Sequence, residues 1–472
     1  MPTAQRPSRF RLAPDVRPTD YHLHLEPDLD AARFRGEVRI DVRLERPRAE
    51  IVLHAANLAI ERSTAEMNEQ VIPLRVRLDR HDETATLRPA RPLPAGTLAL
   101  RLRFSGALNQ HLRGLYSASA GGARYAFTQC EAADARRIMP CFDEPGMKAR
   151  FHVTVTARTG DTVLSNGPVA REQALPGGRR AVHFEPTPPL STYLLALAVG
   201  ALEASEVRHV GPTPIRVWHV PGKSHLAAFG LEAGAEALAR LEDYFGIPYP
   251  YAKLDLVAVP DFEAGAMENA GAVFFRETLL LLDPGTVSLP ERKRAAEVIA
   301  HELAHMWYGD LVTMAWWDDL WLNEAFATWM AYRVVDDWKP EWQMWQGFEH
   351  DRAGALGLDA LASTHPIYAP VRSVAQATEN FDLITYEKGA AVVRMIEHYL
   401  GADAFRDGVR RYMERHREGN AVAADLWRAL GEASGADVAR VAQAWIAQPG
   451  FPLVTLSRAG RTLRVRQERF FA

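Results

Sequence analysis

The sequence has little of several features that mark particular classes of protein. Only two of its 472 residues are cysteines, Cys130 and Cys141, and we interpret them as reduced thiols rather than as a disulfide. No run of about 18 apolar residues occurs, so we expect no membrane-spanning helix. The N-terminal Met-Pro-Thr-Ala-Gln-Arg-Pro-Ser lacks the apolar core of a signal peptide, which predicts a cytoplasmic protein.

An excess of charge of one sign is also missing. The net charge is −4 and no basic block occurs, so nothing favours a nucleic-acid partner or a membrane surface. Hydrophobic residues make up 47% and charged residues 24%, as in ordinary globular proteins. The length exceeds what one hydrophobic core usually supports, which predicts two or more domains and leaves the oligomeric state open.

Apolar and polar residues alternate in the first part of the chain. Residues 38–44, 98–104 and 151–155 follow this pattern, which is typical of half-buried strands. Residues 1–205 are therefore predicted to form an antiparallel, β-sandwich-like domain. Alternation returns in residues 451–472, which we interpret as the incomplete start of a further β domain.

Helical periodicity dominates residues 206–450, with a short strand near their beginning. Helices are expected at residues 226–245, 291–308, 321–335, 387–398 and 424–433. The predicted fold class is α+β and multidomain. A group of tryptophans could suggest a sugar-binding surface, but their spacing through helices favours core positions. They are Trp307, Trp316, Trp317, Trp321, Trp329, Trp338, Trp342 and Trp345.

The strongest chemical signal is His301-Glu-Leu-Ala-His305. Residues four apart on a helix share one face, so both imidazoles can reach one metal ion. Glu302 is placed to accept a proton from a water at that ion. A catalytic zinc has three protein ligands and one open position, and Glu324, on a second predicted helix, completes a set of two histidines and one glutamate.

Two further acidic segments accompany this motif. Gly265-Ala-Met-Glu-Asn is an extended loop that carries Glu268, and Glu131 lies where the β and helical regions meet. Each of these glutamates, taken alone, is more often a surface acid than a binding group. Four nearby charged residues are predicted to form a structural ion-pair network instead: Arg136, Arg137, Asp143 and Glu144.

Together these segments resemble the M1 family of zinc aminopeptidases (gluzincins), in its aminopeptidase-N-like form. The matching segments, in order, are 11–16, 21–29, Gln129-Cys-Glu-Ala, Ala135-Arg-Arg, Pro140-Cys-Phe-Asp-Glu-Pro, Gly265-Ala-Met-Glu-Asn, Val298-Ile-Ala-His-Glu-Leu-Ala-His, Gly309-Asp-Leu-Val-Thr, Trp321-Leu-Asn-Glu and Tyr386-Glu-Lys-Gly-Ala. The resemblance covers nearly the whole chain. It implies a thermolysin-like catalytic domain over residues 206–450 that binds one zinc ion and hydrolyses the N-terminal residue from peptides.

The resemblance also implies a role for each site residue. Zinc ligands would be His301, His305 and Glu324; Glu302 would move a proton to the leaving amine, and Tyr386 would donate its hydroxyl to the oxyanion. The implied substrate-binding residues are Glu131 and Glu268 for a free α-ammonium group, Gly265 and Ala266 for the peptide backbone, Gln129 for the first side chain, and Met267 and Asn269 of the same loop.

The sequence departs from the family pattern at two positions and in length. Met306 stands where the family often has glutamine, and Ala325 where glycine is common, but neither change removes a catalytic group. Typical members continue through a β-sandwich and a long helical domain that caps the site. We therefore expect either a fragment or a naturally short enzyme, with a wider and wetter cleft.

Two alternative functions remain. One is the related leukotriene-A4-hydrolase-like type, which opens an epoxide in a fatty-acid-derived substrate as well as cleaving peptides. The other is a truncated, non-catalytic relic that binds or scaffolds. The form of the Gly265-Ala-Met-Glu-Asn loop favours peptides, and the full set of catalytic residues argues against decay.

Overall fold

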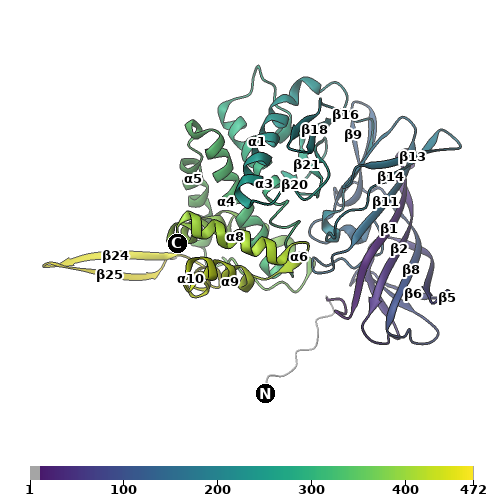
Figure 1. The fold of residues 1–472 in the computed structure, drawn as a ribbon, viewed down its shortest axis with the longest axis horizontal. Helices are drawn as coiled ribbons and strands as arrows, with labels where there is room; N and C mark the ends of the chain where they lie inside the picture. Colours follow the sequence, from purple (N-terminus) through teal and green to yellow (C-terminus); the bar gives the residue numbers. More distant parts are fainter. Residues whose placement is uncertain (1–10, 471–472) are drawn as a thin grey trace.

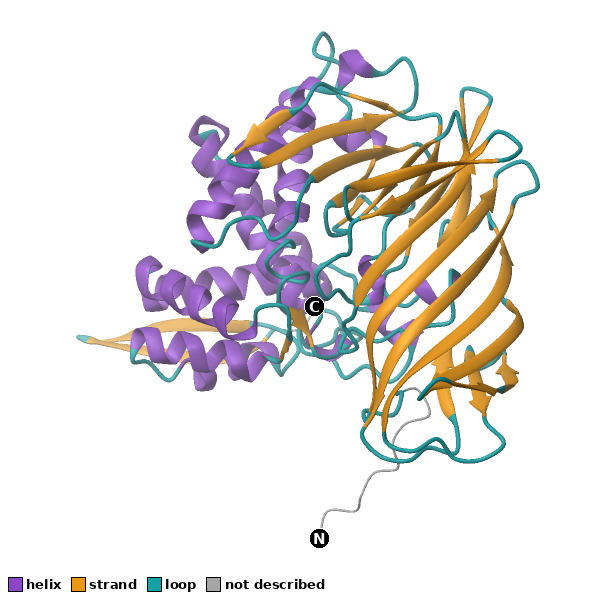
Figure 2. Cartoon of the chain, turned by 45° about the vertical axis from the view of Figure 1, so that its right-hand side comes forward, coloured by secondary structure: helices purple, strands orange, loops and turns teal. Residues whose placement is uncertain are grey.

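The computed structural model describes residues 11–470, in which an N-terminal β region is followed by a mainly helical region (Figure 1, Figure 2). The N-terminal stretch in which we looked for a signal peptide lies outside the described residues, as do the last two residues. The predicted order of a β-rich part before a helical part is confirmed. The predicted domain boundaries at 205 and 450 stay predictions.

Three sheets build the β region. An eight-stranded sheet has the spatial order β13 (Val169–Leu175), β14 (Arg179–Phe184), β11 (Arg150–Arg158), β1 (Val16–Asp28), β2 (Arg33–Leu44), β8 (Gly96–Ala107), β4 (Ala59–Met67) and β5 (Gln70–Pro73). A four-stranded sheet has the order β12 (Thr162–Ser165), β15 (Leu197–Gly200), β10 (Ala123–Gln129) and β9 (Gly114–Ala120). A three-stranded sheet contains β3 (Ile51–His54), β7 (Thr84–Arg88) and β6 (Arg75–Asp79). Their inward side chains share one hydrophobic core, which includes both cysteines as free thiols.

The prediction of a purely antiparallel β region is wrong at one pairing. β1 and β11 run parallel, with Tyr21 opposite Phe151, and their rings stack at 4.9 Å between centroids. A parallel pair requires a long crossover, and here β2 to β10 intervene between the two strands. Alternation along one strand carries no information about such a distant partner.

The helical region contains a larger sheet than the single strand that the sequence indicated. Its strands are β16 (Glu203–Ala204), β17 (Arg208–Val210), β18 (Thr213–His219), β19 (Leu254–Val259), β21 (Ala272–Arg276) and β20 (Ala266–Met267). β18, β19 and β21 are parallel, and every residue of β19 is buried. Strands buried on both faces lose the alternation by which strands are recognised.

Ten α-helices complete the described part of the chain. They are α1 (Ala228–Phe245), α2 (Glu277–Leu280), α3 (Leu289–Ala304), α4 (Trp321–Trp338), α5 (Met344–Asp359), α6 (Val374–Glu379), α7 (Gly389–Leu400), α8 (Ala402–His416), α9 (Ala423–Ser434) and α10 (Val438–Ile446). The five predicted helices are confirmed, although α3 ends four residues early, because the amides of Met306 and Trp307 bond to carbonyls only three residues back. Within residues 11–470, no helix has the length and apolar character needed to span a bilayer.

Five of the eight tryptophans that were predicted to be core residues are buried. Trp307, Trp317, Trp321, Trp329 and Trp342 are buried in the hydrophobic cores, which confirms their predicted role. Three others are only partly buried against those cores: Trp316, Trp338 and Trp345.

The predicted C-terminal hairpin is present. β24 (Pro452–Ala459) pairs with β25 (Thr462–Arg469), and the two strands project away from the helices (Figure 1). Its apolar side chains are largely exposed, Val465 at 65%. That this hairpin opens a third domain stays a prediction.

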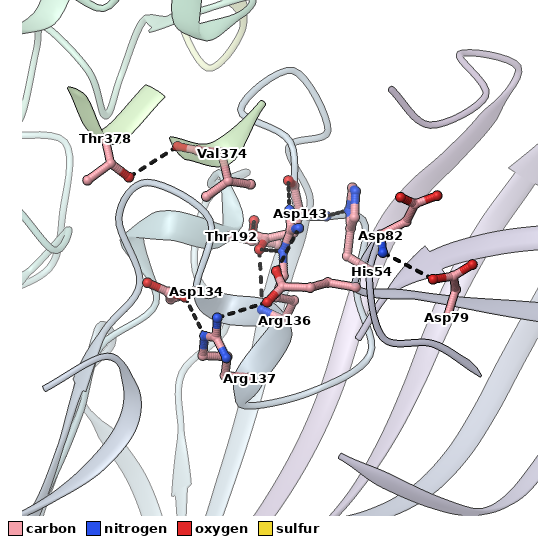
Figure 3. Close-up of polar contacts among 11 residues, drawn as sticks. His54, Asp79, Asp82, Asp134, Arg136, Arg137, Asp143, Thr192, Val374 and Thr378 are labelled. Atoms are coloured by element: carbon pink, nitrogen blue, oxygen red, sulfur yellow. Dashed lines mark hydrogen bonds and ion pairs between the residues drawn. The ribbon is translucent and has the colours of Figure 1, made fainter. Parts of the chain in front are cut away.

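A buried ion-pair network ties the β region to the loop that follows β10 (Figure 3). Arg136 Nε lies 2.9 Å from Asp143 Oδ2, and both side chains are almost fully buried. Glu83 contacts Arg136 and Arg137 at 3.3 and 2.8 Å, and Arg137 also pairs with Asp134 at 2.6 Å. The predicted network is thus confirmed for Arg136, Arg137 and Asp143, whereas Glu144 pairs with Arg11 at 2.9 Å instead.

We predict that Asp143→Ala destabilises the protein strongly. The change leaves the Arg136 guanidinium buried without its main partner, which costs about 3–5 kcal/mol of unfolding free energy. Denaturant titration should show this loss. Glu50→Ala, which breaks the exposed Glu50–Arg88 pair of the same region, should cost about 1 kcal/mol or less, and equal losses in the two variants would contradict the prediction.

Candidate functional site

The helix that carries the histidine motif has a strong N-terminal signal. Ser288 caps α3 by accepting a hydrogen bond from Glu291 N, while Glu291 Oε2 accepts one from Ser288 N at 2.8 Å. Pro290 lies in the first turn, where its missing N–H costs nothing. The helix that presents His301 therefore begins at Leu289, two residues before the predicted start at residue 291.

Three side chains that could bind a metal ion converge: His301 in α3, His305 at its C-cap and Glu324 in α4. His301 Nε2 lies 3.0 Å from His305 Nε2 and 3.3 Å from Glu324 Oε2, and His305 Nε2 lies 3.5 Å from the same carboxylate oxygen. Tetrahedral bonds of about 2.0–2.1 Å separate two donor atoms by about 3.3 Å. The three donors therefore have the spacing that a tetrahedral divalent metal requires.

The chemistry of the donors also fits a metal. Tyr308 O can only accept, so His305 Nδ1 donates to it at 2.9 Å and leaves Nε2 free to face the ion. Burial lowers the pKa of His301 to about 4, which keeps its ring neutral. Burial lowers the pKa of His305, but the negative charges of Glu268 and Glu324 outweigh burial and raise it above its usual value. The surroundings of His305 therefore favour a positive charge.

Three further carboxylates surround the triad, and within residues 11–470 none of them forms an ion pair with a lysine or arginine. Glu131, Glu268 and Glu324 have ligand atoms within 4.8 Å of one another, as do Glu268, Glu302 and His305. One oxygen each of Glu131, Glu268 and Glu302 is buried without a hydrogen-bond partner. Burial raises the pKa of all three, that of Glu268 to about 7. Such a group of buried acids has room and charge for cationic ligands.

Tyr386 faces the triad from a widened helical turn. It lies in a π-helix, Ile384–Lys388, in which Lys388 N bonds to Leu383 O, five residues back. Its ring stacks on His301 with centroids 5.8 Å apart. The turn thus brings a phenol beside the predicted ligands.

The loop that carries Glu268 forms one edge of the six-stranded sheet. β20 pairs with β21 alone among the described strands, so its other edge can bond an extended peptide. Gln129 donates to Met267 Sδ at 3.4 Å. Met267 and Asn269 are buried behind the cavity wall and do not line it, so their predicted contact with a substrate finds no support in this geometry.

The remaining predicted site residues line one cavity of about 760 Å³. They are Gln129, Glu131, Gly265, Ala266, Glu268, His301, Glu302, His305, Glu324 and Tyr386. The sequence analysis missed several residues of the same wall, among them Arg294, Glu297 and Glu387. Glu297 precedes His301 by four residues, so helical spacing could have found it.

Comparison with known proteins identifies the family. Residues 17–194 match the Peptidase M1 N-terminal domain, and residues 229–445 match the Peptidase family M1 domain. The chain belongs to peptidase family M1. Both M1 matches agree with the order of a β region and a helical region in the structure.

Similar M1 proteins are aminopeptidases by name. The chain is 40% identical to Aminopeptidase M1-C of Oryza sativa subsp. japonica, over 98% of the chain and 53% of that protein. It is 39% identical to Aminopeptidase M1 of Arabidopsis thaliana, over 98% of the chain and 54% of the relative. It is 40% identical to the Alanine/arginine aminopeptidase of Saccharomyces cerevisiae, over 98% and 55%. The chain spans about half the length of these curated relatives.

The donor geometry predicts that His305→Ala abolishes metal binding. Protein purified and dialysed with a trace of zinc should retain one divalent ion per chain, measured by plasma emission, and the variant should retain almost none. His111→Ala, at an exposed histidine, is the matched control and should keep the ion. Equal metal content in folded preparations of both variants would show that the triad is not the site.

Proposed function

We propose that this chain contains the active site of a zinc aminopeptidase, which removes the N-terminal residue from peptides. The observation that carries the proposal is the position of Glu131 and Glu268 beside the metal triad. A metal triad alone serves endopeptidases as well. Two adjacent acids that lack cations favour a substrate with a free α-ammonium group.

These two acids would fix where the chain is cut. Burial raises the pKa of both carboxylates, and a nearby carboxylate raises each further: Glu268 beside Glu131, and Glu324 beside Glu268. An ammonium group between them would relieve both effects. The N-terminal residue would then end at the triad, and its carbonyl would be the one attacked.

Glu302 is suited to transfer the proton in this reaction. Zinc bound by His301, His305 and Glu324 would polarise the scissile carbonyl and make water more nucleophilic. The Glu302 carboxyl lines the cavity, and burial raises its pKa. A base with a raised pKa can take the proton of the attacking water and pass it to the leaving amine.

Other groups would hold the peptide and the developing charge. The free edge of β20 at Gly265 and Ala266 would pair with an extended backbone. The Tyr386 hydroxyl would donate to the carbonyl oxygen as charge develops there. Gln129 would lie against the first side chain.

The finer domain assignment belongs to the same proposal. Residues 206–450 would form a thermolysin-like catalytic domain, and residues 451–472 would begin a third β domain. The greater length of the relatives and the exposed apolar face of β24 and β25 support the second assignment.

We predict chelator-sensitive release of the amine from alanyl anilides, and none from their N-acetylated forms. Glu268→Gln should raise the KM of the free substrate by about tenfold or more, because a charge-assisted contact to the ammonium is lost. Glu232→Gln, at an exposed position of α1, should leave the KM unchanged.

The same panel separates the alternatives. Release only from N-acetylated substrates would exclude an exopeptidase. Opening of an epoxy fatty acid without anilide release would favour the epoxide-opening type. No chelator-sensitive turnover of any substrate would favour a non-catalytic relic.

We predict that Glu302→Gln and Tyr386→Phe both lower kcat with little change in KM. Loss of the general base should cost about 10²–10⁴ in rate, and loss of one oxyanion donor about 10²–10³. Tyr399→Phe, which makes the same change at an exposed tyrosine of α7, should keep full activity. Wild-type kcat in either site variant would remove that residue from the proposed chemistry.

A further inference from the structure

The cavity has a second acidic wall, formed by Glu297 and Glu387, which we call the distal acidic wall. Glu297 precedes His301 by one helical turn, so it lies about 6 Å nearer the N-terminus of α3 on the same face. Glu387 directly follows Tyr386 in the π-helix. Both side chains line the cavity that contains the metal triad.

Acidic side chains outnumber basic ones at the distal acidic wall. Arg294 pairs with Glu297 at 2.7 Å, and the nearby Asp382 pairs with His365 at 2.8 Å. Glu387 is 8% exposed, and its Oε2 is buried without a hydrogen-bond partner. Burial and the charge of Glu297 raise the pKa of Glu387 to about 8. A cation supplied from outside would satisfy this carboxylate.

The kind of cation follows from the neighbouring side chains. A catalytic zinc ion has three protein ligands, and among residues 11–470 neither Glu297 nor Glu387 belongs to a group of three within reach of one ion. Apolar side chains line the same part of the cavity: Leu358, Phe381 and Leu383. A lysine or arginine side chain combines an apolar stem with one charge, which matches such a wall.

The position of the wall identifies the substrate residue that would reach it. Glu131 and Glu268 cluster with His305 and Glu324, at the C-terminal end of α3. Glu297 lies beyond His301, toward the other end of that helix. A peptide held by its N-terminus at Glu131 and Glu268, with its first carbonyl at the triad, would place its second residue on the distal side.

We propose that the distal acidic wall selects peptides whose second residue is lysine or arginine. This inference rests on the proposed aminopeptidase function and specifies the substrate class of that site. Glu387 accepts the cationic head, while Glu297 holds Arg294 aside and keeps it from repelling the substrate.

The test measures kcat/KM for tetrapeptides Ala-X-Ala-Ala in which X is lysine, norleucine or glutamate. Lysine and norleucine have stems of similar length, so their ratio isolates the charge. The wild-type protein should prefer lysine over norleucine by about tenfold or more, and glutamate should be the poorest. Glu387→Gln should bring the lysine/norleucine ratio close to one.

Controls keep the outcomes distinct. Glu379→Gln removes an exposed carboxylate on α6, next to the cavity-lining Thr378, and should keep the wild-type ratio. Glu297→Gln should lower the lysine/norleucine ratio as well, because it frees Arg294 to repel the lysine side chain. This variant tests the inference if Glu387→Gln fails to fold. A wild-type ratio near one together with anilide hydrolysis would overturn this inference alone. Absence of anilide and peptide hydrolysis would overturn the proposed function with it.

Discussion

The cleft is governed by the cost of burying carboxylates without cations. Glu131, Glu268, Glu302 and Glu324 share one cavity, and the core beside it is packed with aromatic side chains such as Trp307 and Trp329. Such groups either bind a proton or bind a cation. Among the described residues, Glu131, Glu268 and Glu302 each have one buried oxygen without a hydrogen-bond partner, and burial raises the pKa of each, so a cationic ligand would stabilise their ionised forms.

The β region is part of the site rather than a separate module. Glu131 lies in the loop after β10, and the next residues of that loop are held by Asp134–Arg137 and Arg136–Asp143 pairs. Other hydrogen bonds join the β region to the helical region. Tyr193 donates to Gly309 O at 3.1 Å, and Tyr116 donates to Asp261 O at 2.8 Å. The position of Glu131 relative to His305 therefore depends on both regions being folded.

The sequence predicted the parts of the site that depend on local geometry. Helical spacing brings His301 and His305 together, and the capping box at Ser288 determines where their helix starts. The same spacing could have found Glu297. Glu387 could not be found this way, because its direction depends on the extra residue of a π-turn.

Long-range pairings escaped prediction for a different reason. The parallel partner of β1 is chosen by the packing of distant segments, and the sheet around β19 hides its pattern by complete burial. The spacing of Glu131 and Glu268 along the chain does not predict that they lie close together. Only the resemblance to the M1 family predicted a shared role for them. The structure supplies that proximity directly.

Beyond the first side chain, which would lie against Gln129, electrostatic selectivity in the proposed cleft would come from its two acidic ends. Pairing with the free edge of β20 uses only backbone groups, so it aligns any extended peptide and distinguishes none. Glu131 and Glu268 would bind the α-ammonium group, which every peptide with a free N-terminus carries. The distal acidic wall is the first place past the cut where the identity of a side chain changes the electrostatic energy. Discrimination between peptides that share an N-terminal residue would therefore depend on Glu387, whose Oε2 has no hydrogen-bond partner among the described residues.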